Sequence, residues 1–130
     1  MKLTNQTLIN SVQGFNEIME KELPYSITLK ISKNIKKIQN LLNDYNEEFN
    51  KLSNQYFEKD EKGNYITNEQ GIKIKDNLVN EYAEKINILN SFENEIELYM
   101  IDSNDLKDIK LSPKALLAIE FIINEQEEEE

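Results

Sequence analysis

Residues 31–56 read ISKNIKKIQNLLNDYNEEFNKLSNQY, and this stretch decides the fold. Its apolar side chains alternate at spacings of four and three residues: Ile31, Ile35, Ile38, Leu42, Tyr45, Phe49, Leu52 and Tyr56. A repeat of about 3.5 residues places all of them along one side of a single helix. At a rise of about 1.5 Å per residue, that helix is about 40 Å long. We expect it to be the central helix of a small protein.

The start of this helix has two interpretations. Tyr25, Ile27 and Leu29 alternate with polar residues, which is a strand pattern. Ser26, in contrast, is a good N-cap, and the helical repeat follows it directly. We favour a helix from about Ser26 to about Phe57, and the strand over 25–31 stays an alternative.

Shorter helices are expected on both sides. Thr4 is a suitable cap for a first helix, which must end before Leu23-Pro24 because the residue before a proline avoids helical angles. Asp76 or Asn77 is expected to cap a helix that ends near Phe92. Folded back antiparallel, this helix would form a hairpin with the central helix but leave the Ile31 end uncovered.

Two further segments have strand and helix patterns. Residues 59–76 contain Gly63 and Gly71 beside short alternating runs, which predicts a small β-tongue at the tip of the hairpin. Residues 96–100 alternate apolar and polar side chains, which predicts a short strand. Ser112-Pro113 starts a last helix that is apolar almost all round, so that helix is either buried on most sides or contacts another subunit.

The expected fold class is therefore mainly α: a long central helix in an antiparallel hairpin with a β-tongue, and packing helices at both ends. We expect one helical domain over 1–124 and a disordered acidic tail over 125–130. The C-terminal region is the expected cover for the Ile31 end of the central helix.

Composition excludes several functions. The 130 residues include 15 basic side chains, all lysine, and 25 acidic ones, so the net charge is −10. Such a chain is repelled by phosphate backbones, so DNA or RNA binding is not expected. Cysteine and histidine are absent, which removes thiolate chemistry, the usual general base and the usual zinc ligands. We expect no cofactor, no signal peptide, no membrane span and a cytoplasmic location.

Lysines near the start of the central helix form the one candidate ligand site. Residues 1–37 carry six lysines and three glutamates, whereas residues 38–130 carry nine lysines and 22 acids. On the helix the candidate residues point away from the apolar side: Lys30, Lys33, Lys36 and Lys37. They either bind a phosphate or nucleotide, or form an ordinary solvated helix face, and the solvated face is the simpler interpretation.

Two acidic clusters were considered as metal sites. Residues 60–64, DEKGN, lack the spaced ligands and final glutamate of a calcium-binding loop, so a charged turn is expected. Asp102, Asn104, Asp105 and Asp108 are more typical of a capped connector. No carboxylate has an evident catalytic partner and no glycine-rich phosphate loop is present, so no metal site and no enzyme are expected.

The heptad pattern also fits a homodimeric coiled coil. Its flanking positions include Lys30, Lys36, Lys37 and Lys51, which would repel one another in a parallel pair. They suit an acidic neighbour instead, such as the helix with Glu81 and Glu84, which favours the hairpin. Glu81 and Glu84 are also the candidate contacts for a basic protein partner.

The order of these features resembles a family of small uncharacterised proteins encoded by phages and prophages of Gram-positive bacteria. The resemblance rests on Leu23-Pro24, residues 30–37 (KISKNIKK), residues 58–64 (EKDEKGN), residues 95–98 (EIEL) and residues 111–113 (LSP). It implies no assigned activity and no functional residues. It does imply a context in which small acidic proteins act by binding, commonly against host defence systems.

These observations lead to one preferred function and two alternatives. The preferred one is a non-enzymatic phage accessory protein that binds a host protein, such as a counter-defence inhibitor. The first alternative is an oligomeric sponge that sequesters a nucleotide immune signal. The second is a virion structural or assembly protein. A homo-oligomer is compatible with each of them.

Overall fold

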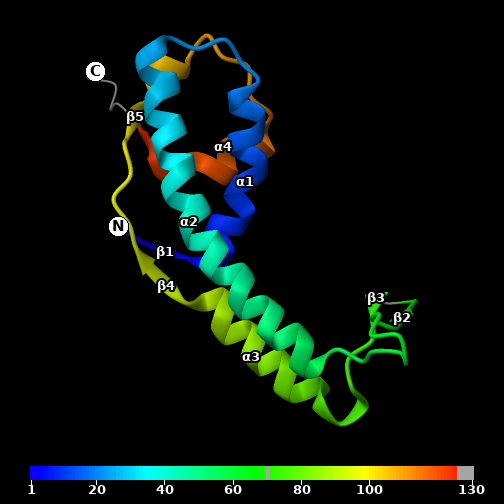
Figure 1. The fold of residues 1–130 in the computed structure, drawn as a ribbon. Coiled ribbons are helices and arrows are strands. Elements are labelled where there is room, and N and C mark those ends of the chain that lie inside the picture. Colours follow the sequence, from blue (N-terminus) through cyan, green and yellow to red (C-terminus); the bar gives the residue numbers. More distant parts are fainter. Residues whose placement is uncertain (70, 126–130) are drawn as a thin grey trace. The chain divides into compact units, whose positions relative to one another are not determined.

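The computed structural model describes residues 1–69 and 71–125, and the predicted disordered tail lies outside them except for Glu125 (Figure 1). The prediction of a mainly helical protein is confirmed. Its α-helices are α1 (Asn5–Met19), α2 (Tyr25–Tyr56), α3 (Val79–Ser91) and α4 (Pro113–Ile119). Short 3-10 helices span Asp76–Leu78, Ser103–Leu106 and Glu120–Ile122.

Short strands form three separate pairs. They are β1 (Lys2–Thr4), β2 (Thr67–Asn68), β3 (Gly71–Ile72), β4 (Glu93–Glu95), β5 (Ile101–Asp102) and β6 (Ile123–Asn124). β1 pairs antiparallel with β4, with Lys2 opposite Glu95, and β2 pairs antiparallel with β3. β5 and β6 are parallel, with Ile101 opposite Ile123.

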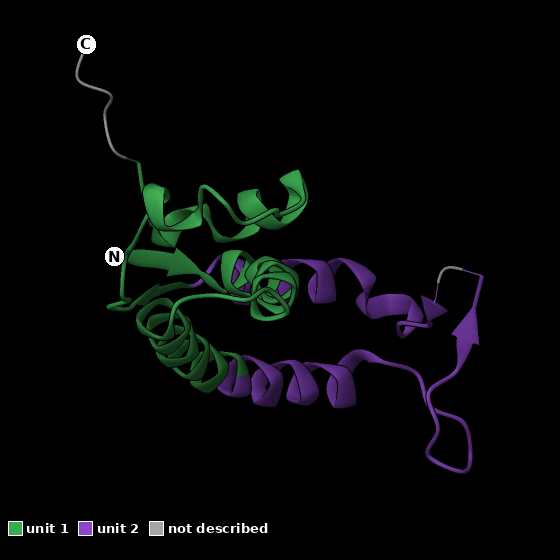
Figure 2. Cartoon of the chain, turned by 90° about the horizontal axis from the view of Figure 1, so that it is seen from above, with its two compact units in different colours: residues 1–42, 93–130 green, residues 43–92 purple. Residues whose placement is uncertain are grey.

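The chain divides into two compact units, shown in Figure 2: unit 1 comprises residues 1–42 and 93–130, and unit 2 comprises residues 43–92. The single domain over 1–124 and the arrangement of a hairpin with a tongue at its tip stay predictions.

The long helix was predicted correctly, and its start differs by one residue. α2 begins at Tyr25, and the carbonyl of Pro24 accepts hydrogen bonds from the N–H groups of Ile27 and Thr28, both at 3.0 Å. The strand alternative for 25–31 is therefore wrong. Ser26 lies inside the first turn and is not the N-cap, because the preceding proline already provides the accepting carbonyl.

The core of unit 1 is apolar and joins both ends of the chain. Its most buried members come from α1, from the first part of α2 and from the C-terminal region: Leu8, Ile18, Ile31, Ile38, Ile101, Ile119 and Ile122. The expectation that C-terminal residues cover the Ile31 end of the central helix is thus confirmed. Burial of each of these side chains contributes about 1.5–3 kcal/mol.

Local signals at two helix starts were also predicted correctly. The Thr4 hydroxyl accepts a hydrogen bond from the Thr7 N–H at 3.1 Å, and the Ser112 hydroxyl accepts one from the Ala115 N–H at 3.1 Å. The cap predicted at Asp76 or Asn77 is wrong. A 3-10 turn over Asp76–Leu78 precedes α3, and no side chain caps either helix.

Residues 96–100 do not form the predicted strand. The strand lies earlier, at β4, because β1 pairs with it and the pairing ends where Met1 and Ile96 exchange hydrogen bonds at 3.0 and 2.9 Å. Beyond that point the chain is extended and is held by side chains of α2.

Of the two alternatives for the last helix, burial on most sides is wrong, and contact with another subunit stays a prediction. Ala115 and Ile119 are buried, but Leu116 and Leu117 are 46% and 66% exposed. α4 therefore buries one side in unit 1 and leaves an apolar side open, as a helix with a missing neighbour would.

Unit 2 is held together by aromatic rings. The Phe57 ring lies 5.3 Å from Tyr82 of α3 and 5.5 Å from Tyr65 of the tongue segment. The Tyr45 hydroxyl donates to Asn90 Oδ1 at 2.7 Å, which joins α2 to α3. At the base of the tongue segment, Lys73 pairs with Glu58 at 3.1 Å.

Helices α1 and α4 approach each other at Gly14. A Cβ atom at this position would lie 2.8 Å from Ile119 Cγ2 and 2.9 Å from the Ala115 carbonyl oxygen. Cβ atoms essentially never approach other heavy atoms this closely, so a side chain larger than that of glycine would force the two helices apart. Glu17, one turn further, accepts a hydrogen bond from the Ser112 N–H at 2.8 Å and so joins the start of α4 to α1.

We predict that Gly14→Ala destabilises the protein by about 1–3 kcal/mol, the usual cost of overpacking. An unobstructed Gly→Ala change inside a helix would instead stabilise by about 1 kcal/mol. The sign of the change in the free energy of unfolding, measured by urea denaturation, therefore distinguishes overpacking from an unobstructed substitution. Asn40→Ala, at an exposed position of α2, is the control and should change stability little.

A second prediction concerns pH. Hydrogen bonds from the Ser112 backbone and then the Ser112 side chain hold the pKa of Glu17 below its ordinary value of 4.5. A pKa lowered in the folded state means that the stabilisation is present above the unfolded pKa and is lost as the pH falls through the folded value. Wild type should therefore melt higher than Glu17→Gln at pH 7, and the difference should shrink below about pH 4. A difference in melting temperature that does not vary with pH would contradict this assignment.

Candidate functional site

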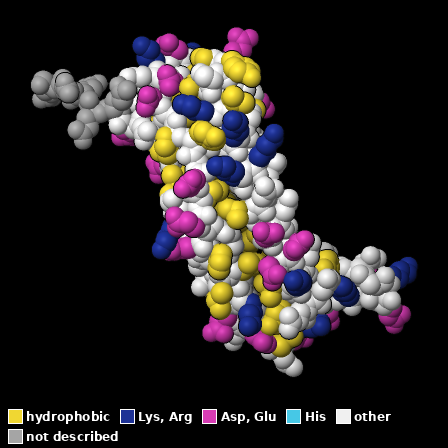
Figure 3. Space-filling view, turned by 60° about the vertical axis from the view of Figure 1, so that its left-hand side comes forward, with side chains coloured by type: hydrophobic (Ala, Val, Ile, Leu, Met, Phe, Trp, Pro, Cys, Tyr) yellow, Lys and Arg dark blue, Asp and Glu magenta, His cyan; other side chains and the backbone are white. Residues whose placement is uncertain are grey.

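The four candidate lysines lie on α2 within unit 1. Lys33, Lys36 and Lys37 are exposed and Lys30 is half-buried. Figure 3 shows a group of lysine side chains together on one face of the molecule. The structure thus places the predicted residues on one helix and in one region, as expected from their spacing.

Two of these lysines contact a ring that sequence reasoning missed. The Nζ atoms of Lys33 and Lys37 lie 5.5 and 5.3 Å from the centre of the Tyr99 ring. Lys37 also donates a hydrogen bond to the Glu97 carbonyl at 2.7 Å. Each cation–π contact at an exposed site contributes about 0.5–1 kcal/mol.

Tyr99 itself is held by a buried amide. Asn34 is fully buried, and its Nδ2 donates to the Tyr99 carbonyl while its Oδ1 accepts from the Tyr99 N–H, both at 2.8 Å. Asn34 therefore makes the two hydrogen bonds to the Tyr99 backbone that a neighbouring β-strand would make. Together, Asn34, Lys33 and Lys37 fasten the extended segment 96–100 to α2.

This arrangement has two chemical consequences. The two ammonium groups can attract an anion, and Tyr99 beside them is 42% exposed. The same contacts also leave fewer N–H groups free to bind a ligand, because Lys37 already donates a hydrogen bond to the Glu97 carbonyl. The lysines thus serve the fold in unit 1 whether or not a ligand binds.

Glu81 and Glu84 lie on α3 in unit 2, where both are exposed. On the same side of the helix stand two large apolar side chains that sequence reasoning assigned to no site, Ile88 and Phe92, which are 65% and 60% exposed. At about 100° per residue, these four positions fall within an arc of about 80°. We call this surface the α3 ridge: Glu81, Glu84, Ile88 and Phe92.

Three tyrosines of unit 2 have a raised pKa. Tyr56 is 1% exposed, and burial, followed by its hydrogen bond to the Glu81 carboxylate, raises its pKa above 10. Burial likewise raises the pKa of Tyr45 and of Tyr82. All three therefore stay neutral at ordinary pH and pack as uncharged rings, and Tyr45 and Tyr56 also donate hydrogen bonds, to Asn90 and Glu81.

The acidic cluster at residues 60–64 forms a structural turn, as predicted. In the second cluster Asn104 and Asp105 lie in the 3-10 helix Ser103–Leu106, but the side chain of Asp102 does not cap that helix. Asp60 Oδ1 accepts hydrogen bonds from the N–H groups of Lys62 and Asn64 at 2.9 and 3.0 Å, and Gly63 completes the turn at a φ of 82°. The Asp60 carboxylate is thus directed at the backbone of its own loop. Within residues 1–69 and 71–125, no group of three or more acidic side chains is close enough to hold a metal ion.

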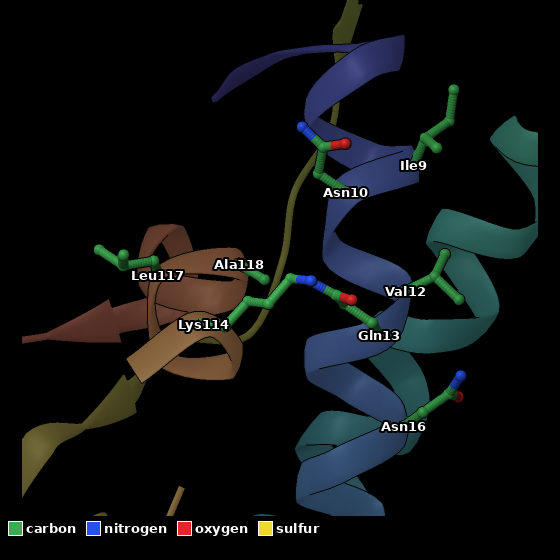
Figure 4. Close-up of a pocket in the computed structure, with 8 residues that line it drawn as sticks. All are labelled: Ile9, Asn10, Val12, Gln13, Asn16, Lys114, Leu117 and Ala118. Atoms are coloured by element: carbon green, nitrogen blue, oxygen red, sulfur yellow. The ribbon is translucent and has the colours of Figure 1, made fainter. Parts of the chain in front are cut away.

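An open groove of about 700 Å³ lies between α1 and α4 in unit 1 (Figure 4). Its walls are Ile9, Asn10, Val12, Gln13, Asn16, Lys114, Leu117 and Ala118. Figure 4 shows Lys114 reaching from α4 toward Gln13 and Val12 pointing toward α2. Sequence reasoning missed this groove, because the approach of α1 to α4 depends on packing at Gly14.

Comparison with protein-family models, with curated proteins and with solved structures finds no match for this chain. Among the described helices, none has the length and apolar character needed to cross a membrane. The candidate surfaces are therefore assessed on their own geometry and charge.

We predict that Asn34→Leu, which preserves size but removes both hydrogen bonds, destabilises unit 1. Leaving a buried donor or acceptor unpaired costs about 1–3 kcal/mol per group. Urea denaturation measures the loss, and hydrogen exchange at the Tyr99 amide should accelerate. Asn40→Leu, at an exposed position of α2, is the control, and equal stabilities of the two variants would contradict the role assigned to Asn34.

Proposed function

We propose that this protein acts by binding a host protein through the α3 ridge and carries out no chemical reaction. The observation that carries the proposal is the pair Ile88 and Phe92, two large apolar side chains one helical turn apart and 65% and 60% exposed. Monomeric proteins seldom leave neighbouring large apolar side chains in water without a use for them. The phage context that the sequence resemblance implies supports a host protein as the partner, and a counter-defence inhibitor as the role.

The spacing of the ridge supports a particular form of recognition. Positions 81, 84, 88 and 92 follow the i, i+3, i+7, i+11 pattern by which one side of a helix enters a partner's apolar groove. α3 contributes no buried residue to its own unit, so its outer side is free to be covered. Covering Ile88 and Phe92 would contribute about 1.5–3 kcal/mol for each side chain.

Charge supports a basic partner. Unit 2 carries ten acidic side chains and six lysines, and Glu81 and Glu84 lie directly beside the apolar pair. Acidic residues around an apolar contact increase the rate of association with a positively charged groove and disfavour acidic partners. In this proposal α2 and α3 form the predicted antiparallel hairpin, which the Tyr45–Asn90 hydrogen bond supports.

The test is capture of a host protein from an extract of a Gram-positive bacterium, followed by affinity measurement with the purified partner. Ile88→Ser with Phe92→Ser should weaken binding at least about 100-fold, since each tenfold corresponds to about 1.4 kcal/mol. Glu81→Lys with Glu84→Lys should slow association, and more so at low salt.

Ile72→Ser is the matched control, because Ile72 is 43% exposed on β3 and lies outside the ridge. A partner that binds the ridge variant as tightly as wild type would overturn the proposed surface. Turnover of any substrate by the purified protein would overturn the non-enzymatic function.

A nucleotide sponge is the second candidate, and the observation in its favour is the pair of ammonium groups beside the exposed Tyr99 ring. A cyclic nucleotide should then raise the melting temperature. Lys33→Glu with Lys37→Glu should abolish that rise, whereas Lys85→Glu on α3 should leave it unchanged. No rise with any nucleotide would exclude this candidate.

A further inference from the structure

The outward side of α1 is unusual in a chain whose surface is otherwise heavily charged. Residues 3–16 form the longest stretch of the sequence without a charged side chain, although 31% of all residues are charged. This stretch supplies the outer side of α1, where the exposed or half-buried residues are Gln6, Ile9, Asn10, Val12, Gln13 and Asn16. A solvated helix side normally carries Lys and Glu, so this composition is typical of a surface that meets another protein.

The groove beside this helix side has the same character. Among the described residues that line it, Lys114 is the only one with a charge. Val12 is 40% exposed and Leu117 is 66% exposed, and both line the groove. The open side of α4 is therefore continuous with the uncharged side of α1.

The net charge of the chain indicates which partner can bind to this side of α1. A chain with a net charge of −10 repels its own copies wherever carboxylates face each other. Two copies can meet at low electrostatic cost only where few carboxylates face each other. The α1 side from Gln6 to Asn16 has none, and Glu17 at its edge already accepts a hydrogen bond from the Ser112 N–H at 2.8 Å. The one charged residue among those that line the groove, Lys114, is a cation and attracts an acidic copy.

We propose that two copies of this chain form a dimer through the outer sides of α1, arranged antiparallel about a two-fold axis at Gln13. Such an interface uses the same surface of both copies. It places Gln13 opposite Gln13 of the second copy and Asn10 opposite Asn16 of the second copy. Every carboxamide has both a donor and an acceptor, so these pairs are complementary to themselves without any charge.

Flanking residues agree with this register. Glu17, the nearest carboxylate on the same side, falls opposite Ile9 of the second copy. Glu20, which follows the end of α1, falls opposite Gln6, so neither carboxylate faces a second acid. Val12 and Leu117 border the contact and would lose exposure in the dimer. The α3 ridge lies in unit 2 and takes no part, so the dimer stands or fails independently of the proposed function.

Sedimentation equilibrium of the full chain provides the first test. A mass of two chains is expected at about 100 µM, and dimerisation should strengthen when NaCl is raised from about 50 to about 300 mM, because salt screens the repulsion between acidic copies. Gln13→Glu should weaken the dimer about tenfold or more by placing two carboxylates face to face. Gln39→Glu, an exposed position of α2, should leave it unchanged. A monomer at all concentrations, or equal effects of the two variants, would overturn the proposal.

Crosslinking provides the second test, and the absence of cysteine makes it clean. Gln13→Cys at the two-fold axis should form an intermolecular disulfide rapidly under mild oxidation, since Cβ atoms must approach to about 3.5–4.5 Å. Gln39→Cys should stay reduced at the same protein concentration. Asn10→Cys should react slowly, because the antiparallel register separates the two copies of that position. Equal rates for Asn10→Cys and Gln13→Cys would overturn the antiparallel arrangement.

Discussion

The fully buried side-chain amide of Asn34 fastens the segment 96–100 to α2 within unit 1. Asn34 occupies the place of a neighbouring strand for Tyr99, with one hydrogen bond to its N–H and one to its carbonyl. The adjacent residues Ile96 and Ile101 can then pack on Ile31 and Ile38. A buried polar group is stable only when fully paired, so this amide specifies one position of the segment on α2 and disfavours a shift by one residue.

Unit 2 is stabilised differently. Its helices share few fully buried aliphatic side chains, and the contacts come from aromatic rings around Phe57 together with the Tyr45–Asn90 hydrogen bond. A helix packed by half-buried side chains retains apolar surface on its other side. Ile88 and Phe92 are the result, and a surface of this kind gains more from a partner than a fully amphipathic helix would.

Much of the fold followed from local rules. The period of α2 and the caps at Thr4 and Ser112 depend on residues a few positions apart, and these were predictable. The stop predicted at Leu23-Pro24 comes too late, because α1 already ends at Met19. Contacts between distant residues were not predictable. Nothing in the local pattern shows that Gly14 faces Ala115, or that Lys33 and Lys37 reach Tyr99. The apolar residues of the α3 ridge were missed because an exposed apolar residue and a core residue look alike in a helical repeat.

The division of the chain has a consequence for synthesis on the ribosome. Unit 2 is one continuous segment, so its contacts can form as soon as residue 92 has emerged. Unit 1 is discontinuous and is completed only when β6 has emerged and pairs with β5. The nascent chain must therefore present the apolar side of α1 and the first half of α2 without their C-terminal cover, a state in which chaperone binding and premature self-association compete with folding.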